Sequence, residues 1–128
     1  MTLPRTRNRS RDFDIVLWGA TGFTGQLVAD YLVRNYLGGD TGLKLALAGR
    51  NEDKVRKVAE EIGEPELPIL VGDSFDTDSL NAIASRAEVV ISTVGPYAKY
   101  GAELVGACVR NGTDYCDLAG ETPWIGRM

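Results

Sequence analysis

The sequence predicts an α/β fold, a doubly wound parallel sheet with helices on both faces, and three observations support this. Short apolar runs alternate with longer amphipathic segments from residue 13 to residue 120. The connections between them are short. The first run, "FDIVLWG", is continuously apolar, which is typical of a strand buried on both faces of a parallel sheet. Because each crossover between parallel strands covers a sheet face with a helix, this alternation leads to the doubly wound architecture.

The first strand is expected at residues 13–19 and the first helix at residues 24–37. Apolar residues recur near helical spacing in that helix, at Leu27, Val28, Tyr31, Leu32 and Tyr36. The stretch "GGDTG" (38–42) stops it, and residues 43–49 alternate as a second strand. The second helix follows at 51–63 and ends at Gly63, the expected left-handed residue after its last turn. Its predicted apolar face consists of Val55, Val58, Ala59 and Ile62.

The same rhythm continues to the end of the chain. Three more strands are expected at 67–73, 88–95 and 113–120, and two more helices at 76–87 and 100–110. The first of these helices has an Asp or Thr near its N-cap. The second carries the apolar residues Leu104, Val105, Cys108 and Val109 and stops at Gly112.

Composition limits the classes of function. A chain of 128 residues suffices for one domain with one core. The net charge of −4 argues against a general nucleic-acid surface, and no run approaches the roughly 18 apolar residues of a membrane span. The sequence contains no histidine, so zinc ligation and Ser/His or Cys/His catalysis are not expected. Cys108 and Cys116 are too far apart for a CxxC pair, and both are interpreted as reduced packing residues.

Residues 1–11 are expected to form a disordered basic leader, and residues 12–128 the folded domain. The leader carries Arg5, Arg7, Arg9 and Arg11 but lacks the apolar region of a signal peptide. A cytoplasmic location is therefore expected. A solvated tail is favoured over contact with a membrane surface or polyanion.

Three glycines follow the first strand in "GATGFTG", and their context indicates a dinucleotide site. Gly19 ends the strand and Gly25 lies in the first turn of the helix, with Gly22 between them. In such Rossmann-type units the glycines permit a tight turn, approach of a pyrophosphate and close helix packing, while the helix N-terminus meets the phosphate charge. Thr21, Phe23 and Thr24 complete the predicted contact loop. The alternative is a merely structural turn.

The end of the second strand predicts which dinucleotide binds. An Asp or Glu there is typical of NAD sites, whereas a cation suits the 2′-phosphate of NADP. This sequence has Arg50 followed by Asn51, which favours NADP, and Lys54 adds a second charge one turn later. The alternative is that Arg50 is an ordinary surface arginine.

Two later segments are expected at the same cleft, because ligands of such sheets bind beyond the carboxyl ends of the strands. Asp73 and Ser74 follow the third strand, where they would bound the adenine. The segment from Ser92 to Tyr97 follows the fourth strand, near the nicotinamide ribose. Its expected cofactor contacts are Val94, Gly95, Pro96 and Tyr97. A helix-initiating turn at Gly95 and Pro96 is an equally good interpretation.

The motifs "DIVLWGATGFTG", "LALAGRN", "VVISTVGPYAKYG" and "GTDYCDLAGE" together resemble the N-terminal cofactor domain of saccharopine dehydrogenase-like oxidoreductases. The branch that includes mycobacterial trans-acting enoyl reductases is the most similar. The resemblance covers residues 12–128, and its later motifs are more specific than the glycine turn. It implies an NADP(H)-dependent reductase that transfers a hydride to an enoyl lipid intermediate or a saccharopine-like amino acid. It also implies that the three glycines and Arg50 contact cofactor phosphates.

Members of that family are several times longer, so the chain is expected to be truncated before a substrate domain and inactive by itself. No catalytic residue is identified. Glu121 is a candidate for a substrate-side role, with an N-cap or surface acid as the favoured interpretation. Neither Asp117 nor Lys99 has a recognisable partner for general acid catalysis. Two other classes remain open, a non-catalytic NADP-sensing module and a domain that only packs with partners. A homo-oligomer is compatible with the sequence.

Overall fold

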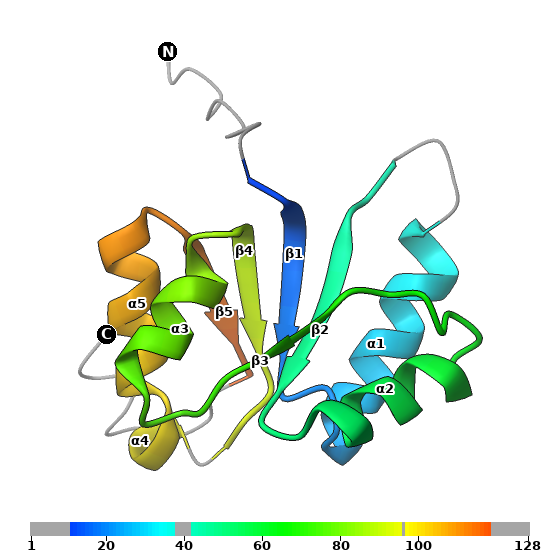
Figure 1. Cartoon of the computed structure of the whole chain (residues 1–128), viewed down its shortest axis with the longest axis horizontal. Helices are drawn as coiled ribbons and strands as arrows, with labels where there is room; N and C mark the ends of the chain where they lie inside the picture. The colour runs from blue at the N-terminus through cyan, green and yellow to red at the C-terminus, as the bar shows by residue number, and fades with distance from the viewer. Residues whose placement is uncertain (1–10, 38–41, 96, 119–128) are drawn as a thin grey trace.

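The computed structural model describes residues 11–37, 42–95 and 97–118, and these form one five-stranded parallel sheet flanked by helices (Figure 1). The strands are β1 (Phe13–Trp18), β2 (Leu45–Gly49), β3 (Ile69–Val71), β4 (Ala87–Ser92) and β5 (Asp114–Asp117). The helices are α1 (Phe23–Tyr36), α2 (Glu52–Glu61), α3 (Thr77–Ala84), α4 (Tyr97–Tyr100) and α5 (Ala102–Asn111). The doubly wound fold predicted from the sequence is confirmed.

The strand order β3-β2-β1-β4-β5 places the first strand at the centre of the sheet. Trp18 at the end of β1 is in register with Ala48 of β2 and with Ser92 of β4, so the carboxyl ends of the strands lie at one edge. Helices α1 and α2 cover one face of the sheet, and α3 and α5 cover the other (Figure 1). The chain therefore reverses its direction of winding between β1 and β4, the usual ligand site of such sheets.

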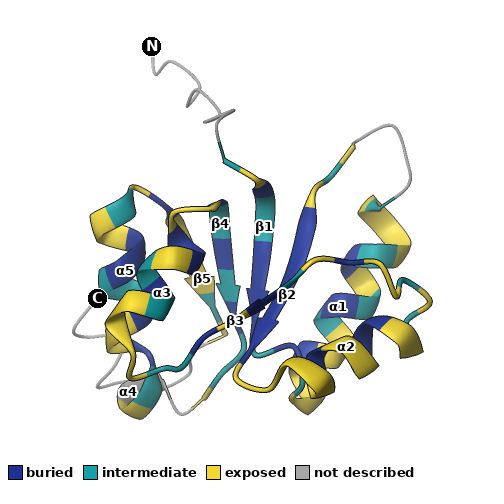
Figure 2. Cartoon of the chain, viewed as in Figure 1, coloured by how far each residue is buried: buried dark blue, intermediate teal, exposed yellow. Residues whose placement is uncertain are grey.

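Two apolar layers hold the helices to the sheet (Figure 2). In β1, Val16 and Trp18 belong to the layer under α3 and α5, whereas Leu17 belongs to the layer under α1 and α2. All five residues of β2 are buried, although the sequence suggested alternation there. The reason is that β2 lies between β1 and β3 and is covered by side chains on both faces. Neither face of β2 is exposed to solvent, even though its residue types alternate.

The helix ends follow local sequence signals. Asn51 caps α2 by accepting a hydrogen bond from the backbone N–H of Lys54, and Asp76 caps α3 by accepting from two backbone N–H groups. Gly63 and Gly112 follow α2 and α5 with φ of +83° and +64°, a region that favours glycine. The predicted Asp cap and both glycine stops are confirmed.

The buried side of α1 differs from the expectation. Gly25, Ala29 and Leu32 are buried against the sheet, whereas Leu27 and Tyr31 are each 57% exposed. Tyr36 is exposed as well, and its ring packs edge-on against that of Tyr31. Small residues let α1 lie close to the sheet. The predicted apolar face is therefore confirmed for Leu32 and Val28 but wrong for Leu27, Tyr31 and Tyr36.

The chain after β4 is also divided differently from the prediction. The single helix expected at 100–110 is two helices, α4 and α5, with Gly101 as the N-cap of the second. Val109 was expected on the apolar face but is exposed, and the buried residues of α5 are Leu104, Ala107 and Cys108. The third strand spans only three residues of the seven expected.

The two cysteines are free thiols in different surroundings. Cys108 is buried, and burial together with the nearby Asp114 carboxylate raises its pKa to about 11. The packing role predicted for Cys108 is confirmed. The same prediction is wrong for Cys116, which is exposed on the edge strand β5. Partial burial and Asp117 nevertheless raise the pKa of the Cys116 thiol.

Arg11 is the first residue that the structure describes, and it contacts the rest of the domain. Its guanidinium donates hydrogen bonds to the backbone oxygens of Ala84 and Asn111 and to the hydroxyl of Thr113. These partners lie at the ends of α3 and α5 and next to β5. The rest of the predicted leader, Pro96 and Glu121 lie outside the described residues. Among the helices within the described ranges, none has the length and apolar character needed to cross a membrane.

Candidate functional site

The site lies where the ends of β1 and β4 meet at the carboxyl edge of the sheet. The backbone N–H of Thr93, just after β4, donates to the backbone oxygen of Trp18 at the end of β1 over 3.0 Å. The glycine turn that follows β1 is therefore held beside the segment that follows β4. The geometry is the one expected of a ligand site at a switch point.

Gly19 has φ of +92°, a backbone conformation that side chains disfavour. A Cβ added at this position would lie 2.6 Å from Cγ2 of Val94 and 2.9 Å from Oγ1 of Thr93. Glycine is thus required at the first position of the turn for two reasons, the dihedral angle and the close approach of the β4 segment.

Gly25 is required for a different reason. It is buried in the first turn of α1, and a Cβ there would lie 2.0 Å from the backbone oxygen of Gly19. No side chain fits in that space. The third glycine therefore lets α1 sit directly on the turn, as the fingerprint predicts.

Gly22 differs from both because a side chain would fit. Its φ is −73°, and the nearest atom to an added Cβ is the Gly19 oxygen at 3.7 Å. It is the N-cap of α1 but supplies no side-chain cap, and the first turn contains no acidic residue. The N–H groups of that turn and the positive end of the helix dipole are therefore available to an external anion.

The other residues of the turn leave this helix start accessible. Phe23 is 83% exposed, and Thr24 is exposed as well. Thr21 is half-buried, and its backbone oxygen accepts a hydrogen bond from the Gln26 side chain over 2.9 Å. Their predicted contacts with a cofactor stay predictions.

Arg50 is the first residue after β2, the strand next to β1. Its side chain is exposed, and no ion pair joins it to another residue in the described part of the chain. Asn51 is engaged locally, because its Oδ1 accepts from the backbone N–H of Lys54 over 3.1 Å. The cap fixes the start of α2 directly after Arg50. The predicted contacts of Arg50 and Asn51 with a cofactor stay predictions.

The loop after β3 is ordered by its own hydrogen bonds. Asp73 accepts from the backbone N–H of Phe75 through Oδ1 (2.9 Å), and its own N–H donates to Oγ of Ser79 (3.1 Å). Ser74 is half-buried between them. Part of the Asp73 carboxylate is thus used within the loop, and its assignment to the adenine, like that of Ser74, remains a prediction.

The segment after β4 combines packing and exposure. Val94 packs against the apolar layer under α3 and α5, and Gly95 is exposed. Helix α4 begins at Tyr97, so a helix does start directly after Gly95 and Pro96, as one of the two interpretations required. The predicted contact of this segment with the nicotinamide ribose stays a prediction.

Thr93 lies in the predicted cleft segment, but its contact with the glycine turn could not be predicted from the sequence. Its hydroxyl donates to the backbone oxygens of Gly19 (3.1 Å) and Trp18 (3.3 Å). The neighbouring Ser92 is only 2% exposed. The only signal was a hydroxyl residue at the end of an apolar strand, and the partners of Thr93 are 75 and 74 residues away in the chain.

Asp117 and Lys99, for which the sequence indicates no partner, have neighbours in the structure. Asp117 accepts a hydrogen bond from the Tyr115 hydroxyl over 2.7 Å. The Lys99 ammonium lies 5.1 Å from the centre of the Tyr100 ring. Neither contact makes these residues a general acid or base pair.

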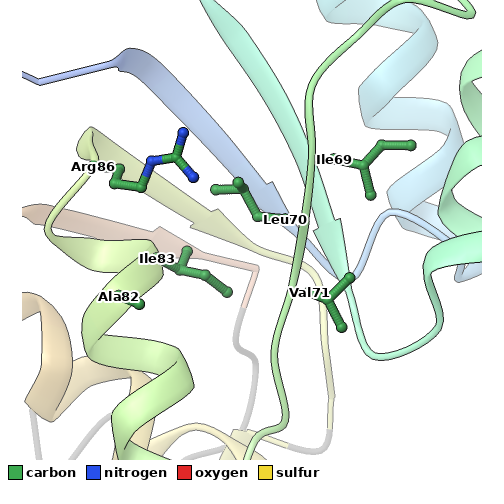
Figure 3. A pocket seen from close by; sticks show the side chains of 6 residues that line it. All are labelled: Ile69, Leu70, Val71, Ala82, Ile83 and Arg86. Atoms are coloured by element: carbon green, nitrogen blue, oxygen red, sulfur yellow. The ribbon is translucent and has the colours of Figure 1, made fainter.

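A hollow of about 270 Å³ lies between β3 and α3, away from the glycine turn (Figure 3). It is lined by Ile69, Leu70, Val71, Ala82, Ile83 and Arg86. The Arg86 guanidinium is bonded to Asp12 over 2.7 Å and stacks on the Phe13 ring, 5.1 Å from its centre. None of the predicted cofactor residues lines this hollow, so it is distinct from the switch-point site.

The strand order, the glycine turn and the uncapped start of α1 define the chain as a dinucleotide-binding domain of the Rossmann type. Comparison with known proteins specifies the family. The model of the saccharopine dehydrogenase NADP binding domain matches residues 15–125, and the chain belongs to this family. NADP is accordingly the cofactor of the domain.

Several curated relatives are mycobacterial proteins. A protein of Mycobacterium tuberculosis, named provisionally as a trans-acting enoyl reductase, is 53% identical over 113 residues. The trans-acting enoyl reductase of Mycobacterium leprae is 47% identical over 113 residues. Each alignment covers 87% of this chain but 26% of the relative, so the chain spans about a quarter of the length of these relatives.

Solved structures share the fold. The apo saccharopine dehydrogenase (L-Glu forming) of Saccharomyces cerevisiae superposes with a TM-score of 0.72 at 23% identity, over 90% of this chain and 23% of that one. A short-chain dehydrogenase/reductase of Veillonella parvula, in complex with NADP, gives a TM-score of 0.64 at 18% identity, over 89% and 50% of the two chains.

Proposed function

We propose that the chain binds NADPH at the switch point and holds it for hydride transfer within a longer oxidoreductase. One observation carries the proposal. The uncapped start of α1 follows β1, and the exposed cation Arg50 follows β2, the strand beside β1. A helix N-terminus and an arginine at these two places match the pyrophosphate and the 2′-phosphate of NADP.

Different residues at the carboxyl edge of the sheet bind different parts of NADPH. The free N–H groups of the first turn of α1 bind the pyrophosphate, for which Gly22 leaves room, and Arg50 binds the 2′-phosphate with Lys54 adding positive charge. Asp73 and Ser74 bound the adenine. The segment from Val94 to Tyr97 lies along the nicotinamide ribose. The supporting observations are the positions of these residues after β1, β2, β3 and β4.

The reaction proposed for the longer protein is reduction of an enoyl group in a lipid intermediate. When bound, NADPH supplies a hydride to one carbon of the double bond while a proton reaches the other, which leaves NADP⁺ and a saturated chain. The names of the mycobacterial relatives support this substrate class. A saccharopine-like amino acid is the competing class, supported by the family description.

Calorimetric titration of the chain with NADPH and NADH tests the proposal. A charge-assisted hydrogen bond contributes about 1.5–3 kcal/mol, so NADPH is expected to bind about ten- to a hundredfold more tightly than NADH. Equal affinities would contradict the role of Arg50. Absence of binding for both would favour a domain that only packs with partners.

Turnover is a separate question from binding. A longer homologous chain that contains this domain is expected to consume NADPH when a lipid enoyl thioester is added, and the rate is followed by the absorbance of NADPH. Binding of NADPH without consumption, across enoyl thioesters and saccharopine-like amino acids, would instead identify an NADP-sensing module.

A further inference from the structure

We propose that Thr93 is a positioning residue that holds the glycine turn in the conformation that receives the pyrophosphate. The inference rests on the proposed function, because it assigns a partner to the same turn. Thr93 would not touch the cofactor. It would act through the backbone oxygen of Gly19.

The Gly19 oxygen accepts two hydrogen bonds from different parts of the chain. The Gly22 N–H donates to it over 3.2 Å from within the turn, and the Thr93 hydroxyl donates to it over 3.1 Å from the end of β4. Thr93 is also tied to the preceding peptide, because its N–H lies 3.0 Å and its hydroxyl 3.3 Å from the Trp18 oxygen. The turn is thus attached to β4 by both the backbone and the side chain of one residue.

The same oxygen is where the glycines meet. An added Cβ at Gly25 would lie 2.0 Å from it, and one at Gly22 would lie 3.7 Å from it. Gly19 itself, which carries this oxygen, has a φ of +92°. The three glycines therefore surround one inward-facing carbonyl, and Thr93 is the side chain that donates to it.

The direction of this carbonyl determines the geometry of the ligand site. A rotation of the Gly19 peptide would break the hydrogen bond from Gly22, the residue whose position starts α1. The first N–H groups of α1 point at the expected phosphate only when that start is fixed. Loss of the Thr93 hydroxyl should accordingly loosen the turn and weaken phosphate binding without removing any group from the ligand.

Thr113 offers a matched comparison at the opposite edge of the sheet. Its hydroxyl donates to the backbone oxygens of Ala84 (2.6 Å) and Ala87 (3.3 Å), and the residue is 7% exposed. Both threonines therefore join strand ends to neighbouring carbonyls. Only Thr93 does so at the glycine turn, so a purely structural role predicts similar behaviour for both residues.

The test compares Thr93→Val, Thr93→Ser and Thr113→Val by calorimetric titration with NADPH. Thr93→Val removes the hydroxyl and should raise the Kd about tenfold, the effect of one lost hydrogen bond. Thr93→Ser keeps the hydroxyl and should stay within about threefold of the unchanged protein. Thr113→Val should lower the melting temperature with the Kd unchanged; if it fails to fold, Thr77→Val, which loses a bond to Glu103, replaces it.

A second measurement needs no cofactor. In the ligand-free chain, hydrogen exchange at the Gly22 amide should be several-fold faster in Thr93→Val than in Thr113→Val, since only the first variant loosens the acceptor of that amide. The proposal would be overturned if the exchange rate of the Gly22 amide were unchanged in Thr93→Val. It would also be overturned if Thr93→Val and Thr113→Val weakened NADPH binding equally. Failure of the unchanged protein to bind NADPH would refute the proposed function, and the exchange result would still decide the role of Thr93.

Discussion

Helices α1 and α3 begin at the same edge of the sheet but treat their first N–H groups in opposite ways. The N-cap of α3 is Asp76, whose carboxylate accepts from the N–H groups of Asp78 and Ser79, and Asp78 adds a further acid to the first turn. The N-cap of α1 is Gly22, with no side-chain cap and no acid in the first turn. Both N-caps have extended backbone angles, so the difference lies in the side chains.

The two helices illustrate two kinds of helix N-terminus, one capped by the protein itself and one open to an anionic ligand. A carboxylate at the N-cap satisfies the helix N–H groups and the dipole from within the protein. A glycine leaves them to a ligand at some cost in stability. The edge therefore contains one helix start that needs nothing further and one that gains when an anion binds.

The largest effect is expected from Gly25→Ala, which would break the close seat of α1 on its turn. The added methyl carbon would lie 2.0 Å from the Gly19 oxygen, so the helix must move. The free energy of unfolding should fall by about 3 kcal/mol or more, as in overpacked cores. Thermal melting measures the loss. Gly22→Ala is the control, since its Cβ has room and the fold should persist; equal melting of the two variants would contradict the close contact between helix and turn.

Gly22→Asp would give α1 the kind of cap that α3 has. The backbone angles of Gly22 suit a capping aspartate, so folding stability should change by only a few tenths of a kcal/mol. The new carboxylate would repel the cofactor phosphates, and NADPH should bind about a hundredfold more weakly or worse. Gly22→Asn adds a side chain of similar size without the charge, so it should lose less NADPH affinity than Gly22→Asp. Normal NADPH affinity in the aspartate variant would mean that the start of α1 is not the phosphate site.

Arg50→Gln tests the second charge of the site. The variant should lose about ten- to a hundredfold in NADPH affinity while its NADH affinity stays the same, because only NADPH carries the 2′-phosphate. Arg56→Gln is the control, as Arg56 is already paired with Glu52 on the exposed side of α2. A parallel loss for both cofactors in Arg50→Gln would move the role of Arg50 away from the 2′-phosphate.

The smallest effect is expected at the structural helix start. Asp76→Ala removes the cap of α3 and should lower the free energy of unfolding by about 1 kcal/mol. The NADPH affinity should stay unchanged, and Asp76→Asn should retain most of the stability. A change in NADPH affinity would show that the start of α3 takes part in binding, and the contrast with α1 would fail.

The sequence predicted the parts of this domain that depend on local pattern. The apolar runs, the glycine stops at Gly63 and Gly112 and the Asp76 cap all act within a few residues of themselves. The family motifs likewise identified the cofactor. The contact of Arg50 with the 2′-phosphate was inferred from its place at the end of the second strand, and it stays a prediction.

What could not be predicted depends on contacts between distant segments. The hydroxyl of Thr93 reaches a carbonyl 74 residues away, and Arg11 reaches Thr113 across 102 residues. Helical spacing alone does not predict that Gly25 and Ala29 face the sheet while Leu27 faces solvent. The distance between α1 and the sheet is set by the glycine turn after β1, where Gly25 packs against the backbone of Gly19. Cys116 is exposed for a similar reason, since it lies on an edge strand.

The central position of β1 also has a consequence for biosynthesis. Of the five strands, β1 is synthesised first. Ala48 of β2, which pairs with Trp18 on one edge of β1, follows about thirty residues later. Ser92 of β4, which pairs with Trp18 on the other edge, follows 74 residues after Trp18. At about 5–20 residues per second, roughly four to fifteen seconds of translation separate these two residues. During that interval one edge of an apolar strand has no neighbour, and such edges attract other chains. The nascent domain is therefore most vulnerable to aggregation before β4 leaves the ribosome.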